Sequence, residues 1–253
     1  MAKQTILTFN PLIAKNKPNS IHRNSACPFC KPDELTEVIA SDGPIILVKN
    51  KYPVLQNTYQ TVLIETDQCD SELSEYSASH LKKVIHFGVE KWLDMEASGA
   101  FQSVIFFKNH GPLSGGSIRH PHMQIIGLKG IDYRDNLKDD YFVGDEILET
   151  DGVSFNLSTK PMIGFTEFNV VIEDLAALDQ AAHLIQITVR YILNRLNGGA
   201  SSYNIFFYEW RGQIAVKIVP RYPTTPLFVG YQIRQVNNQS HQIAEDIRNH
   251  YLS

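Results

Sequence analysis

Two long helical segments, each flanked by β-rich segments, constrain the fold of this chain more than any other feature. Apolar residues recur with the period of one buried helix face over residues 74–97 and again over 175–196, and a glycine, Gly99 or Gly198, follows each segment. The β-rich runs lie at residues 36–40, 44–49, 59–66, 101–108 and 120–128 in the first half and at 168–173, 203–209 and 213–219 in the second. The order strand, helix, strand, strand therefore occurs twice, which predicts two copies of one α+β unit.

The polar stretch at residues 132–152 is the predicted junction between the two copies. We therefore predict a first unit over residues 1–145 and a second over residues 146–253. Residues 1–32 are rich in Asn, Pro, Lys and Ser and show no steady period. They predict an irregular arm that lies against the protein surface.

Composition limits the kinds of partner. The chain has 253 residues, 43% of them hydrophobic, so it can bury a full core. A net charge of −4 argues against a surface that coats nucleic acid, although a local phosphate pocket remains open, and small molecules are the expected partners. Because no apolar stretch has the length of a signal peptide core or a membrane span, the expected location is cytoplasmic, with no membrane partner.

The cysteines predict metal or redox chemistry rather than disulfides. There are three, an odd number, and two of them form Cys27-Pro28-Phe29-Cys30. This spacing can place two thiolates on one turn around a zinc ion. A pair of small buried thiols remains an alternative, as does a redox motif, although redox motifs of this kind open a helix after a strand. Cys69, which follows a strand and precedes the long helix, is a natural third ligand.

A second motif lies at the start of the strand over residues 120–128. Residues 120–124 (HPHMQ) follow a turn-rich loop with three glycines, at 109–119, whose backbone N–H groups could hold phosphate oxygens. Alternation along a strand places His120, His122 and Gln124 on one side. An isolated histidine would be read as a surface or core residue, but the combination with the loop favours a reactive site.

At these residues the chain resembles the galactose-1-phosphate uridylyltransferase branch of the histidine triad superfamily, which includes ADP-glucose phosphorylases and related nucleotide phosphorylases. The family pattern reads here as Asn109, Gly115-Gly116, Ser117 and residues 120–124, and residues 50–53 (NKYP) are similar to the family's nucleotide loop. The resemblance implies two histidine-triad-like units, each an antiparallel sheet with a long helix. The first is catalytic and the second is degenerate.

The resemblance also implies the metal and its ligands. In the family, two cysteines and the first His of His-Pro-His bind zinc, which here gives Cys27, Cys30 and His120. Aligning the starts of the long helices places Cys69 at the position of the family's fourth ligand. One zinc ion held by four protein ligands has no open position for water, so the implied zinc is structural and holds the strand that presents His122.

By resemblance, His122 attacks the α-phosphorus of a nucleoside diphosphate compound, such as a nucleotide sugar, and forms a covalent nucleotidyl-histidine. One ring nitrogen must stay protonated and oriented, most simply by a backbone carbonyl. Ser117, Gln124 and the loop N–H groups at Gly115 and Gly116 are the expected phosphate donors, with help from Asn109. Asn50 and Lys51 are candidates for base or ribose contact, or form an ordinary turn between strands.

Several alternatives stay open. A hydrolase could use the same histidine and release the nucleotide to water, or the protein could be a non-catalytic, zinc-stabilised nucleotide-binding protein. In the second half, Ala215 matches His122, and residues 215–217 (AVK) lack the family's second His-x-His, so a second metal site is not implied. Lys217 and Arg221 could bind an anionic acceptor or lie at a solvated strand edge. Pairing of chains in the superfamily leaves a homodimer open.

Overall fold

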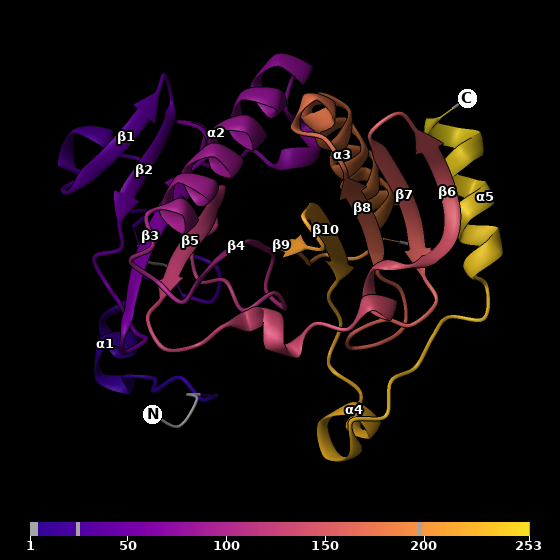
Figure 1. Ribbon diagram of the computed structural model, residues 1–253. Helices are drawn as coiled ribbons and strands as arrows, with labels where there is room; N and C mark the ends of the chain where they lie inside the picture. The colour runs from indigo at the N-terminus through magenta and orange to yellow at the C-terminus, as the bar shows by residue number, and fades with distance from the viewer. Residues whose placement is uncertain (1–4, 24–25, 197–198, 253) are drawn as a thin grey trace. The chain divides into compact units, whose positions relative to one another are not determined.

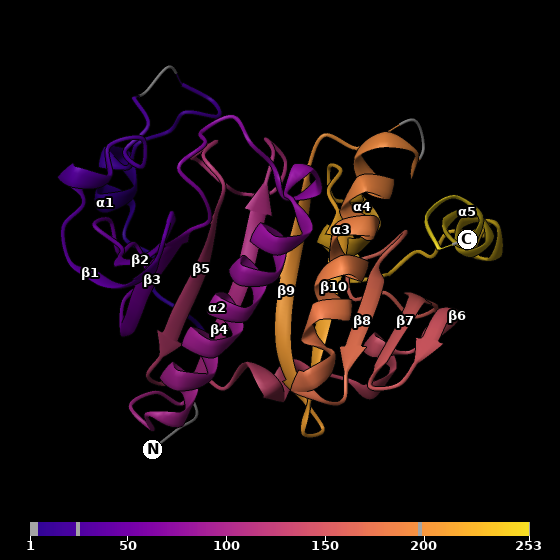
Figure 2. The same ribbon diagram turned by 90° about the horizontal axis from the view of Figure 1, so that it is seen from above.

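The computed structural model describes residues 5–23, 26–196 and 199–252 and divides the chain into two compact units, Met1–Asp135 and Asn136–Ser253. Each unit contains one antiparallel sheet and one long helix that packs on it (Figures 1 and 2). Among the described residues, no helix has the length and apolar character needed to cross a membrane.

Unit 1 forms an antiparallel sheet in the order β1-β2-β3-β5-β4, and its long helix α2 connects β3 to β4. Its helices and strands in chain order are α1 (Pro11–Asn16), β1 (Val38–Asp42), β2 (Ile45–Lys49), β3 (Thr58–Ile64), α2 (Ala78–Ala97), β4 (Ser103–His110) and β5 (His122–Leu128). β5 is an inner strand, paired with β3 on one side and with β4 on the other. The residues at the start of β5 are therefore held from both sides.

Helix α2 covers the face of the sheet formed by β4 and β5 (Figure 2). Ser77 caps its first turn by accepting a hydrogen bond from the His80 N–H. Trp92 is fully buried and donates from Nε1 to the Val104 carbonyl at 2.8 Å, and Gly88 leaves room for the Phe106 ring, which a Cβ at that position would approach to 2.6 Å. These contacts fix the helix to β4.

Unit 2 repeats the same sheet order, β6-β7-β8-β10-β9, with α3 between β8 and β9. Its helices and strands are β6 (Gly144–Thr150), β7 (Val153–Ser158), β8 (Phe168–Ile172), α3 (Leu178–Asn194), β9 (Tyr203–Trp210), β10 (Gln213–Pro220), α4 (Pro226–Tyr231) and α5 (Ser240–Tyr251). Taken in chain order, each strand of unit 2 has a counterpart in unit 1. The predicted α+β class with two similar units is confirmed.

Two parts of the chain differ from the sequence expectation. The N-terminal arm is not wholly irregular, because Pro11–Asn16 forms α1, which begins after Asn10 as N-cap and has a proline in its first turn. The polar stretch that was predicted to be a junction contains strand β6. The sequence did not indicate this strand because its apolar residues, Ile147 and Leu148, lie among Asp, Glu and Thr. β6 and β7 correspond to β1 and β2 of unit 1.

Candidate active site

The three cysteines and His120 lie together in unit 1. One ligand atom from each of Cys27, Cys30, Cys69 and His120 falls within 4.8 Å of every other. The His120 Nδ1 lies 3.5 Å from the Cys27 Sγ and 3.7 Å from the Cys30 Sγ. Zinc bond lengths at a tetrahedral angle place sulfur and nitrogen ligands about 3.6 Å apart. The spacing of these donors therefore fits one tetrahedral ion.

The ring orientation of His120 leaves the correct nitrogen for a metal. Its Nε2 lies 2.7 Å from the Thr66 carbonyl oxygen, which can only accept a hydrogen bond, so Nε2 carries the proton. Nδ1 then keeps its lone pair and faces the thiols. Thr66 lies two residues after the end of β3, so the chain leaving that strand sets the tautomer of a ligand just before β5.

The Cys27 and Cys69 thiols resist deprotonation unless a cation lies beside them. Burial and the neighbouring thiols raise the pKa of Cys69 to about 12, and burial also raises the pKa of Cys27. Three thiolates cannot gather here unless a positive charge compensates them. The Cys3His donor set is soft, as zinc sites prefer, and the group can bind one metal ion.

His122 is the first residue of β5 and is 8% exposed. Its Nδ1 lies 2.7 Å from the His120 carbonyl oxygen and must donate to it, which leaves the lone pair on Nε2. Burial lowers the pKa of His122 to about 4, so the ring is neutral at pH 7. The expectation that a backbone carbonyl orients this ring is confirmed.

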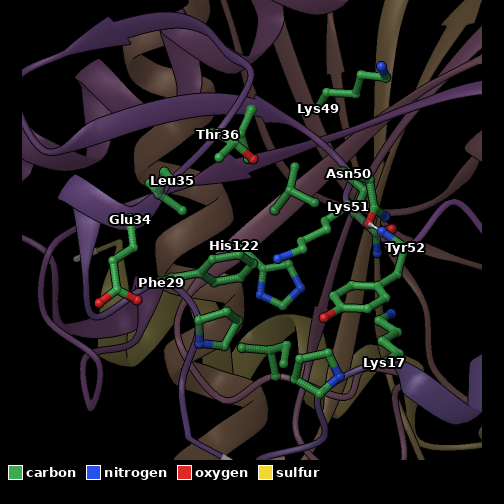
Figure 3. Close-up of a pocket in the computed structure, with 16 residues that line it drawn as sticks. Lys17, Phe29, Glu34, Leu35, Thr36, Lys49, Asn50, Lys51, Tyr52 and His122 are labelled. Atoms are coloured by element: carbon green, nitrogen blue, oxygen red, sulfur yellow. Dashed lines mark hydrogen bonds between the residues drawn. The ribbon is translucent and has the colours of Figure 1, made fainter.

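A cavity of about 190 Å³ opens beside His122. Figure 3 shows the Phe29 ring next to the His122 imidazole and the Lys51 side chain pointing toward it. Asn50, Lys51, His122 and Gln124 all line this cavity, as a nucleotide site built on these residues requires. Four residues of the loop over 109–119 that were expected to help, Asn109, Gly115, Gly116 and Ser117, are not among its lining residues.

Ser117 nevertheless lies in a defined position. Its carbonyl accepts hydrogen bonds from the Ser20 N–H at 2.8 Å and the Ile21 N–H at 3.2 Å, which fastens the N-terminal arm to the loop. Its Oγ is buried and has no hydrogen-bond partner among the described residues. The hydroxyl therefore has its hydrogen-bonding capacity unused, although Ser117 does not line the cavity. Asn50 fits both expectations for it, a nucleotide contact and an ordinary turn. It lines the cavity, and its Oδ1 accepts a hydrogen bond from the Tyr52 N–H in a turn.

Among the cavity residues to which sequence reasoning gave no role are Lys17 and Phe29, whereas Tyr52 entered only as part of residues 50–53. The Phe29 ring contacts the rings of both His120 and His122, with centroids 5.8 and 5.5 Å apart. Its place between the two cysteines was a usable signal, since ligands on both sides fix its position. Lys17 offered no such signal, because the arm around it has no period.

Unit 2 differs at the corresponding positions. Ala215 is fully buried and packs with Phe142 and Val171. Lys217 is 1% exposed, and its Nζ lies 3.0 Å from Glu167 Oε2 and 2.8 Å from Asn169 Oδ1. Both expectations for Lys217, an acceptor site and a solvated edge, are wrong, because its charge is satisfied inside the unit. Arg221 is half-buried and donates to Asn204.

Family models match nearly the whole chain. The N-terminal domain of the domain of unknown function DUF4931 matches residues 9–131, and the C-terminal domain of DUF4931 matches residues 134–252. The crystal structure of a DUF4931 family protein from Bacillus cereus has a TM-score of 0.79 and 44% identity to this chain, covering 85% of this chain and 100% of that one.

More distant proteins share sequence or fold. Diadenosine tetraphosphate phosphorylase 2 of Saccharomyces cerevisiae is 28% identical over 231 residues, which cover 85% of this chain and 68% of the yeast protein. The structure of ADP-glucose phosphorylase from Arabidopsis thaliana has a TM-score of 0.72 at 16% identity, covering 97% of this chain and 95% of that one. The predicted resemblance to this branch of the histidine triad superfamily is confirmed.

Proposed function

This chain belongs to the DUF4931 family, and we propose that it is a zinc-containing nucleotidyltransferase or phosphorylase that works through a covalent nucleotidyl-histidine at His122. The substrate we propose is a nucleoside diphosphate compound such as a nucleotide sugar, and a dinucleoside polyphosphate is a candidate beside it because its α-phosphorus carries the same phosphoanhydride bond. The names of its relatives, an ADP-glucose phosphorylase and a diadenosine tetraphosphate phosphorylase, support this class of substrate.

The orientation of His122 is the observation that most supports the proposal. Because Nδ1 donates to the His120 carbonyl, the lone pair on Nε2 is the ring's free nucleophile, on a residue that lines the cavity. A histidine placed only for packing would need neither this tautomer nor an adjoining cavity. Asn50, Lys51 and Gln124 line the same cavity and can contact a nucleotide.

Two displacements complete the proposed reaction. In the first, a bond forms between Nε2 and the α-phosphorus while the bond from that phosphorus to its bridging oxygen breaks, and the remaining phosphate compound leaves. The cationic ring keeps its Nδ1 proton on the His120 carbonyl. In the second, an oxygen of phosphate or of a phosphorylated acceptor attacks the phosphorus, and the Nε2–P bond breaks. Lys51 and the Ser117 hydroxyl are the donors proposed for the phosphoryl oxygens.

Cys27, Cys30, Cys69 and His120 would hold the zinc ion. A closed four-ligand zinc supplies folding energy and fixes the ring and backbone of His120. It thereby positions the carbonyl that orients His122.

Labelled substrates test the proposal. The protein and its His122→Ala variant would be incubated with UDP-glucose, ADP-glucose and diadenosine tetraphosphate, each labelled at the α-phosphorus, and quenched at alkaline pH. We expect an acid-labile label on the wild-type protein, its transfer to added phosphate or sugar phosphate, and no label on the variant.

The two rivals give different results. A hydrolase with the same nucleophile would release nucleoside monophosphate at once and would not transfer label to an added acceptor. A non-catalytic binding protein would bind nucleotide equally well in both proteins and turn over nothing. Label on the His122→Ala variant would contradict the proposed nucleophile.

A further inference from the structure

We infer that the buried ion pair of Glu65 and Lys108, together with the Tyr76 hydroxyl, positions His122 from the opposite side of the sheet. The inference rests on the proposed function, since it assigns these residues to the same reaction. They do not line the cavity and do not touch a substrate there, so they are positioning residues.

The three side chains form a buried group. Glu65 is 0% exposed and Lys108 is 1% exposed. Lys108 Nζ donates to one carboxylate oxygen of Glu65, and the Tyr76 hydroxyl donates to the other at 3.0 Å. Lys108 comes from β4 and Tyr76 from the residues just before α2, so two neighbouring elements hold the Glu65 side chain.

An ion pair at this depth needs an explanation other than stability. Removing two charges from water costs several kcal/mol for each, and replacing such a pair with apolar residues of similar size is often neutral or stabilising. A charged pair with fixed hydrogen bonds instead holds one backbone position, and the backbone it holds is that of Glu65.

That backbone is the support for the two histidines. The Glu65 N–H donates to the Pro121 carbonyl at 3.1 Å, and the next residue, Thr66, accepts from the His120 ring at 2.7 Å. The His120 carbonyl in turn accepts from His122 Nδ1 at 2.7 Å. A shift of residues 65–66 would therefore move the partners of the Pro121 carbonyl and of the His120 ring. It would thereby displace the His120 carbonyl, which orients the proposed nucleophile.

Unit 2 supplies a matched control. Glu167 and Lys217 form a second buried ion pair, with exposures of 0% and 1% and a distance of 3.0 Å. Glu167 accepts hydrogen bonds from the Met162 and Ile163 N–H groups, both at 2.8 Å, so it holds a loop and no histidine. Two pairs of the same chemistry and burial thus hold different parts of the molecule.

The test compares apolar replacement of the two pairs. Glu65→Leu/Lys108→Met is expected to lower the rate of nucleotidyl-enzyme formation at least about tenfold more than Glu167→Leu/Lys217→Met does, with KM within about twofold of wild type and zinc content unchanged. Glu65→Gln, whose amide oxygen can still accept from Lys108 and whose NH2 group can donate to the Tyr76 oxygen, should recover most of the rate. Equal rates in the two double variants would overturn the inference.

A second measurement is independent of turnover. The His122 Nδ1–H proton, assigned in the NMR spectrum by its loss in His122→Ala, should exchange with water at least about tenfold faster in Glu65→Leu/Lys108→Met than in wild type. An unchanged exchange rate would overturn the positioning role of Glu65 and Lys108, even if no substrate reacted. A wild-type protein without activity would overturn the proposed function alone. If the double variant does not fold, Tyr76→Phe replaces it, with faster exchange expected and unchanged exchange again contradictory.

Discussion

Units 1 and 2 share one order of strands and one long helix, yet the side chains at the same position of the inner strand differ in chemistry and surroundings. In unit 1, His122 begins β5 beside a cavity, and its ring is held by a backbone carbonyl. In unit 2, the matching Ala215 lies under Phe142, and Lys217 is neutralised by Glu167. The position that carries an imidazole beside a cavity in one unit carries a small apolar side chain within a buried cluster in the other.

The fold shared by the two units supplies a firmly held inner strand but not, by itself, a reactive site. Both sheets provide an inner strand held on two sides, so both could present a side chain rigidly. Among the described residues, the cluster of Cys27, Cys30, Cys69 and His120 lies in unit 1, next to the strand whose His122 lines a cavity. We therefore expect changes in unit 1 to affect chemistry and comparable changes in unit 2 to affect stability alone.

The largest expected effect is the loss of the metal cluster. Structural zinc contributes about 10–16 kcal/mol of apparent binding free energy in small zinc domains, so loss of one of four ligands should remove about 5 kcal/mol or more. Cys69→Ser should lower the zinc content from about one ion per chain and lower the melting temperature sharply. Elemental analysis and calorimetry would measure both. Asp70→Asn, one residue away, is the control, and unchanged zinc in Cys69→Ser would remove Cys69 from the site.

Next in size is a stability effect in unit 2. Lys217→Met leaves the Glu167 carboxylate buried without its cation and should lower the free energy of unfolding by about 3–5 kcal/mol. Lys160→Met breaks an exposed pair with Asp140 in the same unit and should leave the free energy of unfolding nearly unchanged. Denaturant unfolding would measure both, and turnover per folded molecule should stay at the wild-type level. A loss of turnover in folded Lys217→Met would contradict the expectation that changes in unit 2 affect stability alone.

The Ser117 hydroxyl should have a smaller, purely catalytic effect. Its Oγ is buried without a partner among the described residues, so removing it costs no internal hydrogen bond. If it donates to the phosphoryl oxygens in the transition state, Ser117→Ala should lower kcat about 100-fold with little change in melting temperature. Ser98→Ala, at the end of α2, is the control. A kcat within about twofold of wild type would remove Ser117 from the reaction.

The smallest expected effect comes from the cavity lysines. Lys51 makes no ion pair with a described residue and points toward His122 (Figure 3), whereas Lys49 is paired with Glu37 at 2.6 Å. Lys51→Ala should raise KM about tenfold, because one phosphate contact is lost, and Lys49→Ala should change it less than about threefold. Steady-state kinetics would separate them. Equal effects of the two variants would contradict the assigned role of Lys51.

Much of the site could be predicted from sequence because its chemistry is local. The thiols, the imidazoles and the glycine-rich loop have few roles together, and the structure brings the predicted Cys3His group within ligand distance of one ion. The pairing of Lys217 could not be predicted, since a lysine on a strand looks solvated until Glu167, fifty positions earlier, is placed beside it. Strand β6 could not be recognised in the sequence because a bulge interrupts its alternation of apolar and polar residues and because several of its residues are acidic.

Mass-spectrometric mapping of the reacted protein tests the central claim most directly. The protein would be mixed briefly with diadenosine tetraphosphate or a nucleotide sugar, quenched at alkaline pH and digested. We expect one nucleoside monophosphate attached to His122 and to no other histidine. Turnover with no adduct, or an adduct on another residue, would contradict it.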